Sequence, residues 1–317
     1  MKSTNELNAD IQAKNYWRDN ERFADFLNSV CFGGKEVIQP DRLKDADTEE
    51  AVSYIKDDQL KNIVRYRDVI KEYGSDMEFI FMGLENQTKV HYAMPVRTQL
   101  YDVLRYVKQC KIIEESHRKN KELKSSDEFL SGMKSTDRLK AVITIVLYYG
   151  EDDWDGAVKL SDMLDVPNEM KQFVNDYNIH LFQIKDLKGD MFKNKDNSQL
   201  FTLVNEFYGS KKGQININEL NNKYAGMEIW WETLAAIGAI TRTEKIIQQA
   251  IYNKGGRIKM CRALDNLMSE ARTEGRIEGQ VKAIDNIVLK LNLTADKACD
   301  VIGITFKEYC DYKKEVR

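Results

Sequence analysis

The chain has 317 residues, of which 42% are hydrophobic and 31% charged, a composition typical of a soluble protein with room for two domains. Its longest apolar run, residues 141–149, is too short to cross a bilayer, and the stretch from Met1 to Trp17 matches neither a secretory signal nor a transit peptide. We therefore expect a cytoplasmic protein without a membrane segment, and the formal net charge of −3 means that nucleic acid would need a local basic surface.

The five cysteines and three histidines are scattered along the chain. Their spacing matches neither a disulfide framework nor a zinc site. No histidine lies beside a convincing nucleophile motif. We therefore expect reduced thiols, and neither zinc nor Ser-His chemistry.

The first predicted element is an amphipathic helix over residues 20–30. Apolar side chains recur there at helical spacing and predict one buried stripe. The stripe consists of Phe23, Phe26, Leu27 and Val30. The opposite face is polar and carries Glu21, Asp25 and Asn28. The charged connection that follows, residues 33–61, is predicted to be mostly loop.

Strands are predicted over residues 63–70 and 78–87, paired antiparallel through a turn at residues 73–76. The apolar run over residues 141–149 predicts a strand buried on both faces. A further strand is predicted over residues 178–185.

Between these strands, Pro95 opens a predicted helix that extends to about Glu115. Its apolar face is predicted to contain Val96, Leu100, Val103, Leu104 and Val107. The order of helix, strand pair, helix and buried strand predicts an α/β fold with helices packed on a mixed sheet.

The pattern becomes helical beyond Phe192, with helices predicted over residues 199–207, 227–237 and 243–253 and another from about Ile258. We expect three regions, whose limits are residues 1–190, 191–269 and 270–317. The last region contains an E-G repeat over residues 274–279, which stacks its two glycines on one helix face. That face suits either an oligomer interface or a frayed, exposed helix. Beyond it, two short helices about a turn are weakly reminiscent of a helix-turn-helix, at residues 294–301 and 306–313.

The predicted hairpin carries the residues with the clearest chemical potential. Alternation along its second strand puts Glu85 and Gln87 on one face. Asp68 lies on the preceding strand, so its carboxylate can approach that of Glu85. Two neighbouring carboxylates suit Mg²⁺, which prefers hard oxygen ligands. The alternative is that these acids are solvated or form salt bridges, for example with Arg65, Arg67 or Lys89.

Four strings in this chain resemble one protein family. They are RFADFLNSVCFGGKEVI, RYRDVIKEYG, FIFMGLENQTKVHYAMPVRTQLYDVLRY and ITIVLYYGEDDWDGAVKL. In this order they resemble the recombination-promoting nuclease (Rpn) and transposase family, a branch of the PD-(D/E)XK nucleases. The resemblance runs through most of residues 16–190. It implies a restriction-endonuclease-like αβββαβ core, followed by the helical C-terminal region.

By the same resemblance, Asp68, Glu85 and Gln87 form the catalytic site, and Asp68 and Glu85 hold Mg²⁺, for which Mn²⁺ is a substitute. Asp25 and Glu21 are then accessory carboxylates. Asn86 stands where many members have histidine, and Gln87 replaces the lysine of the wider superfamily.

The helix after the hairpin carries a second candidate surface. Arg97, Tyr101, Arg105 and Lys108 recur at helical spacing along one flank. Such a stripe predicts salt-sensitive contacts with DNA phosphates. The alternative is a solvated helix flank.

Two functions follow from these features. The first is a Mg²⁺-dependent endonuclease that cuts double-stranded DNA with low sequence specificity and, as the family resemblance implies, promotes recombination. The second is a nuclease-fold module that binds DNA or protein without cutting. A transposase in the strict sense ranks last, because the sequence shows no convincing separate site-specific DNA-binding domain. The C-terminal helices are the candidate surface for a homo-oligomer.

Overall fold

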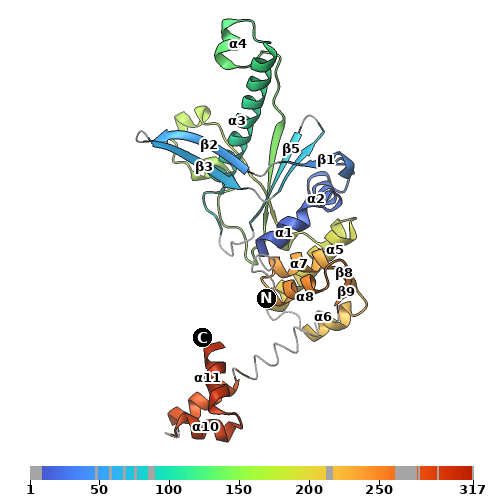
Figure 1. The fold of residues 1–317 in the computed structure, drawn as a ribbon, viewed down its shortest axis with the longest axis vertical. Coiled ribbons are helices and arrows are strands. Elements are labelled where there is room, and N and C mark those ends of the chain that lie inside the picture. Colours follow the sequence, from blue (N-terminus) through green and yellow to red (C-terminus); the bar gives the residue numbers. More distant parts are fainter. Residues whose placement is uncertain are drawn as a thin grey trace. The chain divides into compact units, whose positions relative to one another are not determined.

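The computed structural model shows a mixed α/β protein (Figure 1). It describes residues 9–46, 49–56, 59–66, 69–74, 77–84, 90–211, 217–260, 277, 279–290 and 293–315. The chain divides into two compact units. The first unit comprises residues 1–215 and 229–257, and the second comprises residues 216–228 and 258–317.

A five-stranded mixed sheet forms the centre of the first unit. Its strands, in spatial order, are β1 (Leu43–Asp45), β4 (Val69–Tyr73), β5 (Met77–Leu84), β6 (Ala141–Tyr148) and β7 (His180–Gln183). The first three strands pair antiparallel, whereas β5, β6 and β7 pair parallel. The predicted buried strand is therefore confirmed, and so is an antiparallel pairing at the predicted hairpin, although only Val69 and Ile70 of its first predicted strand lie in β4.

The segment predicted to be mostly loop is instead structured, and that prediction was wrong. It contains the 3₁₀ turn η1 (Pro40–Arg42), strand β1 and strand β2 (Glu49–Lys56), which pairs antiparallel with β3 (Gln59–Tyr66) in a separate two-stranded sheet. Charged residues are depleted in strands, so a strand containing the acidic pair Glu49 and Glu50 is easily interpreted as loop. The predicted strand over residues 63–70 also divides between β3 and β4, which belong to different sheets.

Two helices precede the sheet, α1 (Ala9–Arg18) and α2 (Asn20–Phe32). Asp19 caps α2 by accepting a hydrogen bond from the Arg22 backbone N–H at 2.9 Å. Most of the predicted apolar stripe is confirmed, since Phe23, Phe26 and Leu27 are fully buried.

The position predicted for Asn28 on the polar face of α2 was wrong, because its side chain is buried. Its Oδ1 accepts hydrogen bonds from the backbone N–H groups of Val37 and Ile38 at 3.0 and 2.8 Å. Its Nδ2 donates to the Ile38 carbonyl at 2.9 Å. The Asn28 amide thus forms hydrogen bonds with backbone groups of Val37 and Ile38 that would otherwise be buried without partners.

Lys71 in β4 ties the junction of these helices to the sheet. Its side chain is only 1% exposed, and its Nζ lies 2.6 Å from both Asn20 Oδ1 and Asp45 Oδ1. It also donates to the carbonyl oxygen of Arg18. A buried ammonium needs such a full set of partners, so Lys71 fixes the position of the helix junction over β4 and β1.

A long helix, α3 (Met94–Asn120), and a short one, α4 (Ser126–Ser131), connect β5 to β6. The predicted helix is confirmed, and Leu104 of its predicted apolar face is buried in the core. The rest of that prediction was partly wrong, since Val96 and Val103 are 47% and 49% exposed. The buried face also carries polar side chains, which form hydrogen bonds with β6. Asp102 accepts a hydrogen bond from Thr144 Oγ1 at 2.5 Å, and Tyr106 Oη accepts one from the Val142 backbone N–H at 3.1 Å.

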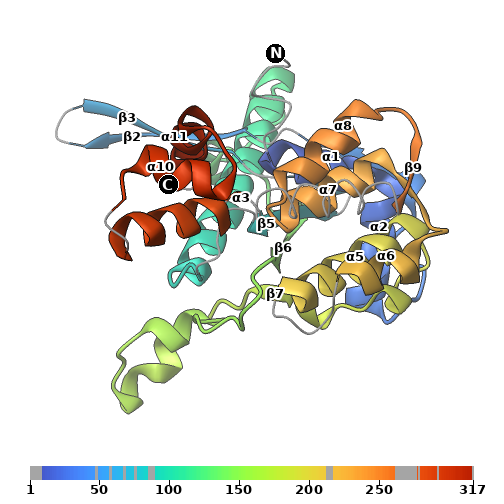
Figure 2. The same ribbon diagram turned by 90° about the horizontal axis from the view of Figure 1, so that it is seen from below.

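Four 3₁₀ turns follow β6. They are η2 (Leu160–Met163), η3 (Asn168–Phe173), η4 (Ile184–Asp186) and η5 (Gly189–Met191). The helices α5 (Lys195–Lys211), α7 (Trp231–Ile240) and α8 (Glu244–Tyr252) then pack with α1 into a helical layer (Figure 2). Aromatic rings fill the space between α1, α2 and α5. They include Trp17, Phe26, Phe192 and Phe201.

These helices belong to the same compact unit as the sheet. The boundary between the two units falls within the short strands β8 (Glu228–Trp230) and β9 (Arg257–Lys259). The predicted helix from about Ile258 starts slightly later, since Ile258 lies in β9 and Met260, directly after this strand, is helical.

The second unit contains α6 (Ile217–Tyr224), a helix over residues 279–290, α10 (Ala295–Ile302) and α11 (Phe306–Glu315). The last three helices share one small core. It consists of Val281, Ile284, Ala298, Cys299 and Tyr309. The two predicted short helices are confirmed, with Gly303 in the left-handed conformation between them (φ 81°). Of the E-G repeat, residues 274–276 and 278 lie outside the described residues. None of the helices in the described part of the chain is long and apolar enough to span a membrane.

Candidate functional site

The three predicted catalytic residues, Asp68, Glu85 and Gln87, lie outside the described residues. Their nearest described neighbours are Val69, which begins β4, and Leu84, which ends β5. In the antiparallel pair, Val69 lies opposite Phe81. The start of β4 and the end of β5 therefore lie at the same edge of the sheet.

The end of β6 lies at this edge as well, because Leu84 is in register with Tyr148. Tyr148 is buried against Met94, the first residue of α3, and against Val146 and Ile179. Burial raises the pKa of the Tyr148 phenol, and the nearby carboxylates of Asp152 and Asp155 raise it further. Met94 and Tyr148 thus form an apolar cluster at this edge, which we call the apolar floor.

The loop after β6 packs against Tyr148 through Trp154. The Trp154 ring meets the Tyr148 ring edge-on, with centroids 5.2 Å apart. Its backbone N–H donates to Gln183 Oε1 at 2.7 Å, and its Nε1 donates to the Gly156 carbonyl at 2.9 Å. A side chain at Gly150 would collide with the Tyr148 ring, so only glycine fits there.

Tyr149 connects the same loop to the helical layer. Its hydroxyl accepts a hydrogen bond from Trp17 Nε1 at 2.9 Å, and its carbonyl accepts one from Tyr208 Oη at 2.5 Å. Tyr149 and Trp154 are therefore structural supports of the sheet edge.

Sequence reasoning did not single out the carboxylates of this loop as candidates. Glu151, Asp152, Asp153 and Asp155 follow the strand directly. Asp153 forms an ion pair with Lys185, and Asp155 accepts a hydrogen bond from Tyr92 Oη at 3.2 Å. The string YYGEDDWD was the available signal, because residues at the ends of parallel strands meet at one edge. Within the described ranges, no group of three or more potential metal ligands comes together.

Helix α3 runs antiparallel to β6. At one end, Met94 packs with Tyr148. At the other end, Gln109 exchanges two hydrogen bonds with the backbone of Lys140, at 3.2 and 2.7 Å. Arg97 therefore lies near the candidate edge, one turn from the start of the helix.

Arg97 is half-buried and contacts Tyr101. Its Nε donates to Tyr101 Oη at 3.2 Å, and its guanidinium lies 5.7 Å from the centre of that ring. The Tyr101 ring itself is only 4% exposed. Tyr101 is thus a core residue that holds the Arg97 guanidinium in place, and it is not itself exposed to a ligand.

The rest of the predicted phosphate-binding stripe lies elsewhere. Arg105 is 5% exposed, and its Nη2 lies 3.7 Å from Glu72 Oε1 near the opposite edge of the sheet. Lys108 follows it along α3, about 16 Å in helix rise beyond Arg97. Arg97, Tyr101, Arg105 and Lys108 therefore do not form one exposed stripe, because α3 turns the flank that carries Tyr101 and Arg105 toward the sheet.

The two predicted accessory carboxylates of α2 occupy different environments. Asp25 accepts hydrogen bonds from the Lys193 backbone N–H at 3.0 Å and from Asn197 Nδ2 at 2.8 Å. Asp25 therefore fastens α2 to the start of α5. Glu21 is exposed in the first turn of α2.

A family model described as "Putative transposase, YhgA-like" matches residues 49–221, more than half of the chain. The matched region contains β2 to β7, α3 and α5, together with the candidate edge of the sheet. No curated protein and no solved structure matches the chain significantly.

Proposed function

Because the chain belongs to the YhgA-like transposase family, we propose that it hydrolyses phosphodiester bonds in double-stranded DNA, with little sequence specificity and with a divalent metal ion. In this proposal Asp68, Glu85 and Gln87 form the active site of a PD-(D/E)XK-type nuclease. Cleavage of this kind would promote recombination.

The register of the three central strands is the observation that carries the proposal. Val69 and Leu84 lie at one edge of the sheet, and Leu84 is paired with Tyr148. Asp68 directly precedes Val69 in the chain, and Glu85 directly follows Leu84. In the proposed site these two carboxylates would meet at that edge and hold the metal ion that assists hydrolysis.

The topology of the sheet supports the same proposal. An α-helix, an antiparallel strand pair, a crossover helix and a parallel strand occur in the order α2, β4, β5, α3 and β6. With β1 included, because it pairs with β4, this order is compatible with the proposed αβββαβ core, although β2 and β3 lie between β1 and β4 in the chain.

The donor set fits a hard divalent cation. Asp68 and Glu85 would hold Mg²⁺ through carboxylate oxygens, the ligands that this ion prefers, and Mn²⁺ would replace it. When bound, the ion would polarise the phosphoryl group and lower the pKa of a water molecule.

The protein's own groups would then position the reactants. The Gln87 amide would orient the attacking water by hydrogen bonding, because it can both donate and accept. Arg97 would contact a phosphate beside the scissile bond, since its guanidinium lies near the sheet edge and is held by Tyr101. The apolar floor of Met94 and Tyr148 would limit water access beneath the substrate.

One feature of the sequence favours a second function. Gln87 occupies the place of the lysine that the wider superfamily uses, and an amide cannot take up a proton at neutral pH. The same fold would then bind DNA or a protein without cutting. Binding that persists in chelator and in Asp68→Ala would identify this function.

A cleavage assay on supercoiled plasmid separates the two functions. Wild type, Asp68→Ala and the control Glu36→Gln are compared in Mg²⁺, in Mn²⁺ and in chelator. Glu36 is a suitable control because its carboxylate is 68% exposed and pairs only with a surface lysine, Lys193, among its described contacts. Metal-dependent nicking by wild type and Glu36→Gln, but not by Asp68→Ala, supports the nuclease. Equal nicking by all three overturns the assignment of Asp68.

A further inference from the structure

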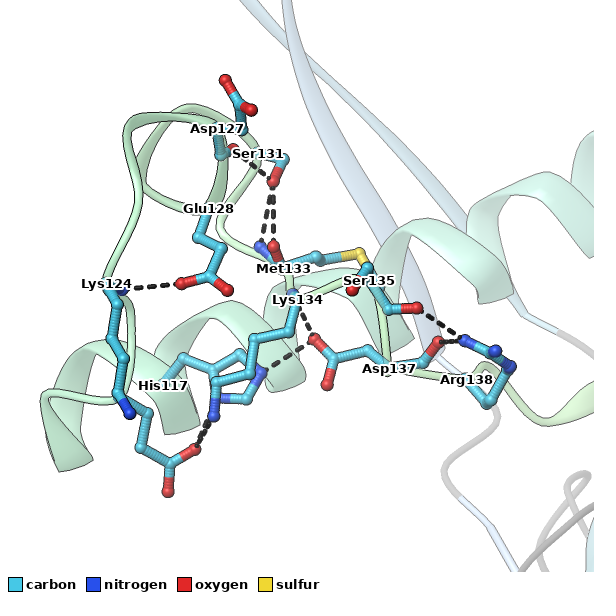
Figure 3. A network of polar contacts seen from close by, with 11 residues as sticks. His117, Lys124, Asp127, Glu128, Ser131, Met133, Lys134, Ser135, Asp137 and Arg138 are labelled. Atoms are coloured by element: carbon cyan, nitrogen blue, oxygen red, sulfur yellow. Dashed lines mark hydrogen bonds and ion pairs between the residues drawn. The ribbon is translucent and has the colours of Figure 1, made fainter.

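A cluster of charged side chains fastens the connection between α3 and β6, far along the chain from the candidate active site (Figure 3). His117 lies in the last turn of α3. Glu122 follows the end of that helix, and Asp137 precedes β6. Between these two carboxylates lies α4, so His117 contacts both ends of the segment that contains α4.

The imidazole ring of His117 bridges the two carboxylates. Its Nδ1 lies 2.8 Å from Glu122 Oε2, and its Nε2 lies 2.8 Å from Asp137 Oδ2. The His117 side chain is only 10% exposed. Figure 3 shows the ring between the helix and the returning chain, with Asp137 on one side.

Lys134 completes the cluster. Its Nζ lies 2.7 Å from Glu122 Oε2, and its backbone N–H donates to Asp137 Oδ2 at 2.7 Å. On α3 itself, the nearby Glu114 pairs with Arg118 at 2.6 Å. The groups that act directly on the ring are therefore two carboxylates and one ammonium.

Both contacts of the ring require its protonated form. A neutral imidazole has one N–H, whereas two carboxylates can only accept. The hydrogen bond to Asp137 raises the pKa of His117 most, and the hydrogen bond to Glu122 raises it further. The positive charge of Lys134 lowers this pKa. The pKa of Glu122 is lowered, first by Lys134 and then by His117. The pKa of Asp137 is lowered too, first by the Lys134 N–H and then by His117.

The same geometry argues against a metal site. The two ring nitrogens point to different carboxylates, so His117, Glu122 and Asp137 cannot present their ligand atoms to one ion.

We propose that His117 is a pH-sensitive latch, which holds residues 121–139 against the end of α3 when protonated and releases them when neutral. On loss of the proton, one carboxylate would face a ring nitrogen that carries a lone pair. That contact becomes repulsive, and the segment opens at Glu122 or at Asp137.

The opening would remain local. Gln109 binds the backbone of Lys140 through a neutral amide, which does not titrate, so β6 keeps its register. Within the segment, the capping box of Ser125 and Glu128 preserves α4. The α4 side chains Phe129 and Leu130 are 63% and 91% exposed, so little apolar burial holds α4 in place.

The direction of the pH dependence follows from the raised pKa. The latch contributes its full stability below the ordinary pKa of histidine. That stability is lost as pH rises through the raised pKa of folded His117. The latch would therefore be closed at low pH and would open as pH rises.

Hydrogen exchange of the full-length chain tests the latch. Protection of the amides in residues 122–139 is measured between about pH 5 and about pH 9, after correction for the intrinsic dependence of exchange on pH. We expect corrected exchange to become about tenfold faster across the transition. Peptides from β6 serve as the internal reference and should not change.

Three variants separate the latch from a merely structural contact. His117→Arg carries a permanent charge and should keep the segment closed at every pH. Glu122→Gln should fold normally and move the transition to lower pH, because one charge that favours the imidazolium is gone. His180→Gln, in an exposed residue of β7, is the matched control and should leave the transition unchanged.

Protection that does not vary with pH in wild type would overturn the proposal. A transition that persists unchanged in Glu122→Gln would overturn it as well. Neither result depends on nuclease activity.

Discussion

Leu84 at the end of β5 lies in parallel register with Tyr148 at the end of β6. The start of β4 lies at the same edge, because Val69 pairs with Phe81 three residues before Leu84. Val69 and Leu84, the chain neighbours of the proposed catalytic residues Asp68 and Glu85, therefore lie at one edge of the sheet.

Gly150→Ala is expected to destabilise the fold. The added methyl group would collide with the Tyr148 ring, and overpacking of this kind costs about 1–3 kcal/mol. Urea unfolding measures the loss. Gly226→Ala is the control, because no atom lies within 4 Å of its added Cβ, and it should change stability by less than about 0.5 kcal/mol. Equal stability of the two variants would contradict the close packing at Gly150.

Lys71→Met is expected to destabilise the first unit by about 1–3 kcal/mol, because it leaves the Asn20 and Arg18 acceptors without their buried donor. Thermal or urea unfolding measures the effect. Lys44→Met, at an exposed position of the neighbouring strand β1, is the matched control. If both substitutions had the same small effect, Lys71 would not fix the helix junction.

Arg97→Ala and Arg105→Ala are expected to have different effects. Arg97→Ala should weaken DNA binding and lower the slope of log affinity against log salt by about 1, with little change in stability. Arg105→Ala should lower stability instead, by about 1–3 kcal/mol, because Arg105 is buried beside Glu72. Binding titrations at several salt concentrations and urea unfolding together measure both effects. The reverse result would place the DNA surface at the far edge of the sheet.

Asp25→Ala is expected to lower stability by about 1 kcal/mol without changing the metal dependence of cleavage, because Asp25 binds the Lys193 backbone and Asn197. Glu21→Ala removes an exposed carboxylate of the same helix and should be neutral. Unfolding curves and metal titrations of both variants test this. A changed metal requirement in Asp25→Ala would return it to the role of an accessory carboxylate.

The central elements were predictable from the sequence because each has a strong local pattern. The run over residues 141–149 is apolar throughout, and the hairpin turn at Gly74 has a characteristic composition. The β2 hairpin was not predictable, because its charged residues resemble a loop.

The buried face of α3 was not predictable for a related reason. Val96 and Val103 suggest an apolar face, but Tyr101, Asp102 and Arg105 are buried instead, with polar partners that lie far away in the sequence. Similarly, the burial of Asn28 depends on the turn at Val37 and Ile38, which local periodicity does not reveal. The candidate catalytic triplet came from the hairpin pattern and from the family resemblance, and its three residues lie outside the described residues.

The most direct test of the proposed function is the rate of plasmid cleavage as a function of Mg²⁺ concentration in wild type, Asp68→Asn, Glu85→Gln and the double variant. If the two carboxylates hold one ion, each single substitution should lower the rate by at least about 100-fold, and the double substitution should lower it little further. Cleavage at the wild-type rate in either single variant, with the same Mg²⁺ dependence, would contradict a metal site formed by Asp68 and Glu85.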